Sequence, residues 1–204
     1  MKAALITAFI GHIICGITDC MMAYTPDGRF DMNKDSKDPV KMRQLFGRMP
    51  LKQIELSMLI GVFALFLSGF GFIGLSRWAE SYSGTAGIIM YISGLFFIVP
   101  ISAHHVLCGA VEWFYIKLGR TDEVLENVLC FFRKTAAAAL AYAGLLVFAA
   151  ALFILLVSGK TDLPRWACVF NTLPFFLVLS PTKLPAKGNI ANAAMFLGLF
   201  FMMP

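Results

Sequence analysis

Five ionisable residues lie inside apolar stretches of the sequence, where a charge is costly: His12, Asp19, His104, His105 and Glu112. A carboxylate at the centre of a membrane helix costs roughly 2.5 to 3.5 kcal/mol on translocon scales, so it is usually buried against protein or a water-filled cavity. Carboxylates and imidazoles in such sites can exchange protons with a bound molecule. We therefore expect a polar pocket within a membrane, with Asp19, His105 and Glu112 as its acid/base residues.

Two of the apolar stretches carry the same pattern of a histidine, a cysteine and a carboxylate. The residues are His12, Cys15 and Asp19 in one, and His105, Cys108 and Glu112 in the other. Spacings of three, four and seven place each set on one helical face. Each carboxylate lies about five residues before the same end of its helix, or roughly 7 to 8 Å at 1.5 Å per residue. The two faces therefore have matching chemistry at matching depth.

Six further residues are predicted to hold a ligand in this pocket: His12, His104, Trp113, Asn171, Asn189 and Asn192. Asn189 and Asn192 lie three residues apart, so they form one polar wall. Asn171, close before a proline, either lines the floor or satisfies a carbonyl that the proline frees. His104 lies off the helical face that carries His105, Cys108 and Glu112, so the alternative for it is an imidazole that reaches the lipid headgroups. The mixture of His, Glu, Asn and Trp is similar in chemistry to that of intramembrane sterol isomerases, although the spacings match no signature of theirs.

Metal ligands and disulfides are not predicted. Two histidines and a carboxylate are enough for a catalytic zinc, and His12, His105 and a carboxylate would supply them, but nothing in the spacing requires it. The five cysteines lie in or beside apolar segments without paired ligand spacing, so they are expected to be reduced packing residues. We accordingly expect no cofactor.

The composition indicates an integral membrane protein. Hydrophobic residues make up 59% of the 204 residues, charged residues only 14%, and the mean hydropathy is +0.77, far from soluble domains. Residues 1–204 are read as a single all-α transmembrane domain. The net charge of +5 is attributed to topology and to membrane lipids, because the sequence contains no nucleic-acid motif.

Six membrane-spanning segments are predicted from the apolar runs. They are Ala3–Tyr24, Ile54–Leu75, Ala86–Leu118, Thr135–Val157, Pro164–Pro181 and Asn189–Met203. The third is long and is expected to kink near Pro100, which removes a helical hydrogen bond. The sixth is shorter than a full span, so it either crosses a thin membrane or enters and stays shallow.

The distribution of lysine and arginine predicts the orientation in the cell membrane. Basic residues concentrate in residues 25–52 and again after the third segment, and such residues are retained in the cytoplasm. Residues 25–52 are therefore a cytoplasmic loop, and both termini lie outside. Residues 119–134 have acidic residues at their start and basic residues at their end, which predicts an amphipathic interfacial helix leading into the fourth span.

The sequence favours one function and leaves two alternatives open. The favoured function is to bind or transform an apolar small molecule, such as a lipid or sterol-like compound, in a cytoplasm-facing polar pocket by acid/base chemistry. The first alternative is a small proton-coupled transporter, in which buried Asp and His relay protons. The second is a non-catalytic membrane subunit that docks a cytoplasmic partner through its basic loop. Whether the protein is an enzyme, and its oligomeric state, are not predicted.

Overall fold

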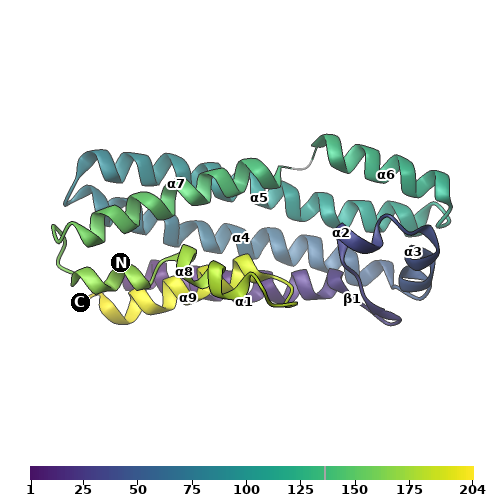
Figure 1. Cartoon of the computed structure of the whole chain (residues 1–204), viewed down its shortest axis with the longest axis horizontal. Coiled ribbons are helices and arrows are strands. Elements are labelled where there is room, and N and C mark those ends of the chain that lie inside the picture. Colours follow the sequence, from purple (N-terminus) through teal and green to yellow (C-terminus); the bar gives the residue numbers. More distant parts are fainter. Residues whose placement is uncertain (136) are drawn as a thin grey trace.

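The computed structural model is an elongated bundle of helices and describes residues 1–135 and 137–204, apart from the side chain of Asn33. Its main helices are α1 (Lys2–Ala23), α4 (Leu51–Glu80), α5 (Gly84–Lys117), α7 (Ala138–Val157) and α9 (Lys187–Met202). They pack side by side in the order α9, α1, α4, α5, α7, and both termini lie at the same end of the bundle (Figure 1).

Within the described residues, four stretches are long and apolar enough to cross a membrane. They are α1, α4, α5 and the stretch Asp122–Val157, which contains α7. The predicted all-α class is confirmed. Helices α1 and α5 begin and end within two residues of the predicted segments, whereas α4 extends the predicted segment by three residues at its start and five at its end. The predicted fourth segment includes Ala136, which lies outside the described residues. Pro100 lies within α5, and the kink there stays a prediction.

The core of the bundle is built from aromatic rings and closely approaching backbones. Phe72 on α4 contacts Phe148 on α7 and Phe196 on α9, with ring centroids 4.9 and 5.1 Å apart. Helices α7 and α5 approach each other closely at Gly144. A Cβ there would lie 2.8 Å from the backbone nitrogen of Phe97 on α5, so only glycine lets α7 and α5 approach this closely.

The predicted basic loop folds into short elements at the end of the bundle opposite the termini (Figure 1). These elements are β1 (Tyr24–Thr25), paired antiparallel with β2 (Gly28–Arg29), then α2 (Met32–Asp35) and α3 (Pro39–Phe46). Asp38 caps α3 by accepting a hydrogen bond from the backbone N–H of Lys41 at 3.0 Å, and Pro39 occupies the first turn. Leu45 and Phe46 are buried in a second apolar core, which anchors the loop to the bundle.

The amphipathic segment forms α6 (Asp122–Thr135), close to the predicted range 119–134. Asp122 and Glu123 lie in its first turn, and Arg133 and Lys134 lie in its last turn, which complements the helix dipole. Its two buried residues, Leu125 and Leu129, belong to the second core, so one face of α6 packs on protein.

The predicted continuous helix from Pro164 to Pro181 is wrong. The chain forms a short 3₁₀ helix η1 (Arg165–Val169) and then the separate helix α8 (Thr172–Leu179). The break falls at Asn171, whose side chain accepts a hydrogen bond from the backbone N–H of Leu173 at 3.1 Å and so starts a new helix. Helices α8 and α9 form a C-terminal hairpin. Helix α8 packs against α9 and also contacts α7, so it connects the first and last helices of the order α9, α1, α4, α5, α7.

Candidate functional site

A cavity of about 320 Å³ lies where the C-terminal hairpin meets the long helices. Its apolar walls come from α4, α5, α7 and α8, and its polar groups come mainly from α1, α5 and α9. The polar and thiol side chains that line it are Cys15, Asp19, His104, His105, Cys108, Tyr142, Lys187, Asn189 and Asn192. A mostly apolar cavity with a few convergent polar groups is the usual form of a small-molecule site.

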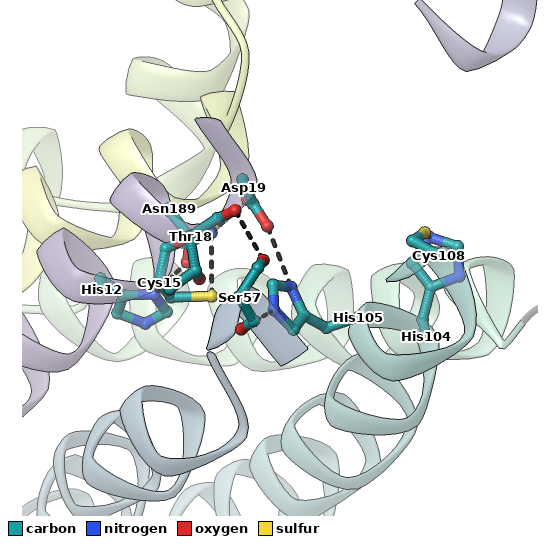
Figure 2. A network of polar contacts seen from close by, with 9 residues as sticks. All are labelled: His12, Cys15, Thr18, Asp19, Ser57, His104, His105, Cys108 and Asn189. Atoms are coloured by element: carbon teal, nitrogen blue, oxygen red, sulfur yellow. Dashed lines mark hydrogen bonds and ion pairs between the residues drawn. The ribbon is translucent and has the colours of Figure 1, made fainter. Parts of the chain in front are cut away.

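Asp19 and His105 form a direct pair across the cavity wall (Figure 2). The Nδ1 atom of His105 lies 3.0 Å from Oδ1 of Asp19, and its Nε2 lies 3.1 Å from the backbone oxygen of Ser57 on α4. A carbonyl oxygen only accepts, so Nε2 must carry a proton. Nδ1 and Oδ1 then require a second proton, or another cation, between them.

The position of the His105 ring depends on a glycine in α4. A Cβ on Gly61 would lie 2.5 Å from Cδ2 of His105 and closer still to Nε2, so the ring occupies the space that any other residue would fill. His105 is only 5% exposed, and the ring therefore has one well-defined place between Gly61, Ser57 and Asp19.

Asn189 on α9 joins the polar groups of α1 into one network. Its amide nitrogen donates to Oδ2 of Asp19 at 2.8 Å and to the Cys15 thiol at 3.3 Å. Its amide oxygen lies 2.8 Å from Nδ1 of His12, which fixes the amide so that its N–H groups face Asp19 and Cys15. The polar wall predicted from Asn189 and Asn192 therefore contacts the polar groups of α1 through Asn189.

His12 lies behind the cavity wall and does not line the cavity. Its ring stacks on Phe196, with centroids 5.7 Å apart and an interplanar angle of 14°, and the residue is 1% exposed. Its Nε2 has no hydrogen-bond partner within the described residues. His12 thus orients Asn189 from a second layer.

Glu112 lines a neighbouring hollow of about 210 Å³ at the loop end of the cavity. Its side chain is buried, at 3% exposure, and its Oε2 has no hydrogen-bond partner in the part of the chain that the structure describes. The hollow shares Asp19, Met22 and Cys108 with the main cavity. Asp19 and Glu112 thus face adjoining spaces, as their matching depth led us to expect.

The remaining predicted residues divide between the cavity and the scaffold. His104 and Asn192 line the cavity; His104 lies 3.6 Å from the Cys108 sulfur, and Asn192 accepts from the Thr172 hydroxyl at 2.5 Å. Trp113 points elsewhere, because its indole N–H donates to Glu55 at 2.8 Å.

Asn171 is completely buried outside the cavity lining. Besides capping α8, it donates to the backbone oxygen of Ala149 on α7 at 2.8 Å. The carbonyl that it bonds lies on α7 and is not one that Pro174 frees, so the observed role differs from both expectations for Asn171.

Sequence reasoning missed three contributors to the site: Ser57, Tyr142 and Lys187. Ser57 acts through its backbone oxygen, which no side-chain pattern reveals. Tyr142 is the only tyrosine in the Ala-rich fourth segment. A single phenol in an otherwise apolar segment could have indicated a residue of the polar site. Lys187 begins α9, whereas the sequence alone places it in the loop before the sixth segment, where a basic residue indicates only the orientation of the chain.

An apolar groove leads from the cavity to the outside of the bundle between α7 and α8. It has a volume of about 220 Å³ and is lined by Tyr142, Leu145, Leu146, Thr172, Leu173 and Phe176. Tyr142, Leu145 and Phe176 also line the main cavity, so the two spaces adjoin. Leu146 is 55% exposed, which places the outer end of the groove on the apolar surface.

The fold and the cavity define an all-helical protein with several helices suited to membrane insertion and a polar cluster between them. The chain belongs to DUF6796, a family of unknown function whose profile matches residues 1–204. No curated protein and no solved structure matches the chain.

Proposed function

We propose that the protein is a multi-pass membrane protein whose cavity binds an amphipathic small molecule, such as a lipid or sterol-like compound, and transforms it by acid/base chemistry. One observation carries the proposal: a cavity with a polar cluster on one wall continues into an apolar groove between α7 and α8. The head of the molecule contacts Asp19, His105 and Asn189. Its apolar chain follows the groove past Leu146 into the bilayer.

The proposed orientation follows the charge of the loops. Residues 25–52 lie in the cytoplasm and both termini lie outside, since the loop and the termini are at opposite ends of the bundle (Figure 1). The C-terminal hairpin of α8 and α9 enters the membrane from the outer side and returns to it, because 8 residues of helix extend only about 12 Å, against a hydrocarbon core of about 30 Å. The cavity then opens on the cytoplasmic half of the membrane, and α6 lies at that interface.

The proposed chemistry uses the proton between His105 and Asp19. A head group that enters the cavity meets a carboxylate and an imidazole 3.0 Å apart, within the distance that general acid/base catalysis needs. Glu112, in the adjoining hollow, is the second proposed proton carrier. Asn189 and Asn192 position the head group by hydrogen bonds.

Native mass spectrometry of the gently solubilised full-length protein tests the binding step. We expect a discrete lipid-sized adduct on the wild type, with occupancy lowered at least about tenfold in Asp19→Asn, because a hydrogen bond to a charged group is worth about 1.5 to 3 kcal/mol. Leu146→Phe should also lower the occupancy by filling the α7/α8 groove.

Val147→Phe is the matched control for the groove variant. Val147 is the next residue of α7, is similarly exposed at 49%, and lines a separate groove between α5 and α7 that shares no residue with the cavity. It should leave the adduct unchanged. The proposal is contradicted if the wild type carries no adduct, or if the adduct persists in both Asp19→Asn and Leu146→Phe. Either result would favour a proton-coupled carrier or a docking subunit.

A further inference from the structure

We infer that Cys15, Asp19 and His105 form a binding site for a divalent metal ion of the zinc class. A sulfur, a carboxylate oxygen and the Nδ1 of an imidazole, supplied by two helices, all lie within 4.8 Å of one another. A tetrahedral zinc holds its ligand atoms roughly 3.3 to 3.6 Å apart, given metal–ligand lengths of about 2.0 to 2.3 Å. Nδ1 and Oδ1 already lie 3.0 Å apart, and the cysteine sulfur lies within 4.8 Å of both.

The proton arrangement of His105 matches that of a metal ligand. Its Nε2 donates to the backbone oxygen of Ser57, so the lone pair of Nδ1 faces the Asp19 carboxylate. Two acceptors at this distance repel each other unless a cation lies between them. Metal-bound histidines almost always donate their other N–H to a carbonyl or carboxylate in this way.

The other two ligands also have outer partners. Asn189 donates one N–H to Oδ2 of Asp19, which leaves Oδ1 free for the metal, and donates to the sulfur of Cys15. His12 holds that amide in place. All three ligands are therefore oriented by a second layer of hydrogen bonds, which is typical of metal sites.

The charge of the three ligands fits a divalent ion in an apolar surrounding. A thiolate, a carboxylate and a neutral imidazole carry two negative charges, and a divalent cation brings the cluster to zero. A neutral site avoids the cost of an uncompensated charge among apolar helices. A mixed sulfur, nitrogen and oxygen set suits zinc better than the hard cations, which take oxygen ligands.

The fourth position of the site faces the cavity, because Cys15, Asp19 and His105 all line it. Three protein ligands and one open position are typical of a catalytic rather than a structural zinc. The inference deepens the proposed function and rests on it for the molecule that reaches this position. The metal ion would polarise an oxygen of the head group, in place of the proton shared by Asp19 and His105.

Metal binding to the full-length protein in detergent tests the site, with Zn²⁺ alone and Co²⁺ alone as probes. We expect one Zn²⁺ per chain by elemental analysis and a thiolate-to-cobalt charge-transfer band with Co²⁺. Cys15→Ser keeps an acceptor for Asn189 but should weaken Zn²⁺ binding by at least about 100-fold, since loss of an outer partner alone costs 10- to 100-fold. Cys108→Ser is the matched control, because Cys108 also lines the cavity but lies outside the ligand set.

The outcomes separate this inference from the proposed function. A wild type that binds no Zn²⁺ and shows no charge-transfer band overturns the metal site without any variant, and leaves the adduct test of the cavity untouched. Zn²⁺ binding that is equally lowered by Cys15→Ser and Cys108→Ser, or by neither, overturns the ligand assignment. A metal site confirmed on a protein without a lipid adduct would instead refute the proposed ligand.

Discussion

The Gly61→Ala substitution tests whether the place of the His105 ring is fixed by backbone packing. The new methyl group would overlap the ring, with its Cβ 2.5 Å from Cδ2. The ring must therefore move, and its hydrogen bonds to Ser57 and Asp19 are lost. Overpacking costs about 1 to 3 kcal/mol and each lost buried hydrogen bond about 1 to 3 kcal/mol, against a gain of about 1 kcal/mol from helix propensity. These terms sum to an expected net loss of about 2 to 8 kcal/mol.

Gly69→Ala, in the same helix, is the control for that loss. A Cβ on Gly69 would lie 3.8 Å from Ile98, which is an ordinary contact, so this variant should be as stable as the wild type or up to about 1 kcal/mol more stable. Equilibrium unfolding of the detergent-solubilised protein measures both free energies. Equal stability of Gly61→Ala and Gly69→Ala would refute the packing argument, since only one of the two methyl groups meets the imidazole.

Two further predictions concern the scaffold around the site. Asn171→Ala removes the cap of α8 and the hydrogen bond that joins this cap to the backbone oxygen of Ala149, so the free energy of unfolding should fall by about 1 to 3 kcal/mol; an unchanged value would contradict the capping role. The Arg48 guanidinium donates to Asp27 and lowers the pKa of that carboxyl. Asp27 therefore stabilises the loop above the pKa of the unfolded chain, and this contribution is lost as the pH falls through the lowered pKa, below about 4. Asp27→Asn should remove that part of the acid dependence of the unfolding midpoint, and a profile identical to the wild type would count against it.

The long helices could be predicted from the sequence because their signal is local. A mainly apolar run of at least about 20 residues identifies α1, α4 and α5 without knowledge of their neighbours. The shared face of His12, Cys15 and Asp19 follows from helical spacing in the same way. Each of these inferences needs only residues that are close in sequence.

The parts that failed or were missed depend on contacts distant in sequence. The apolar segment after Pro164 has the composition of one helix, and only the two bonds of Asn171, one of them to α7, divide it. The pairing of His105 with Asp19 joins residues 86 positions apart. This pairing requires the space beside Gly61 and the backbone oxygen of Ser57. Neither can be predicted from a pattern of side-chain types.

The bond between Asn189 and Asp19 has a consequence for the order in which the protein is made. The two residues are 170 positions apart, so Asn189, on α9, is synthesised long after Asp19. At about 5 to 20 residues per second, the ribosome needs roughly 10 to 30 seconds after Asp19 to supply the amide that accompanies it. During that interval the Asp19 carboxylate on α1 lacks this hydrogen bond. It gains the bond only when α9 packs against α1. Assembly of the site therefore waits for the synthesis of α9.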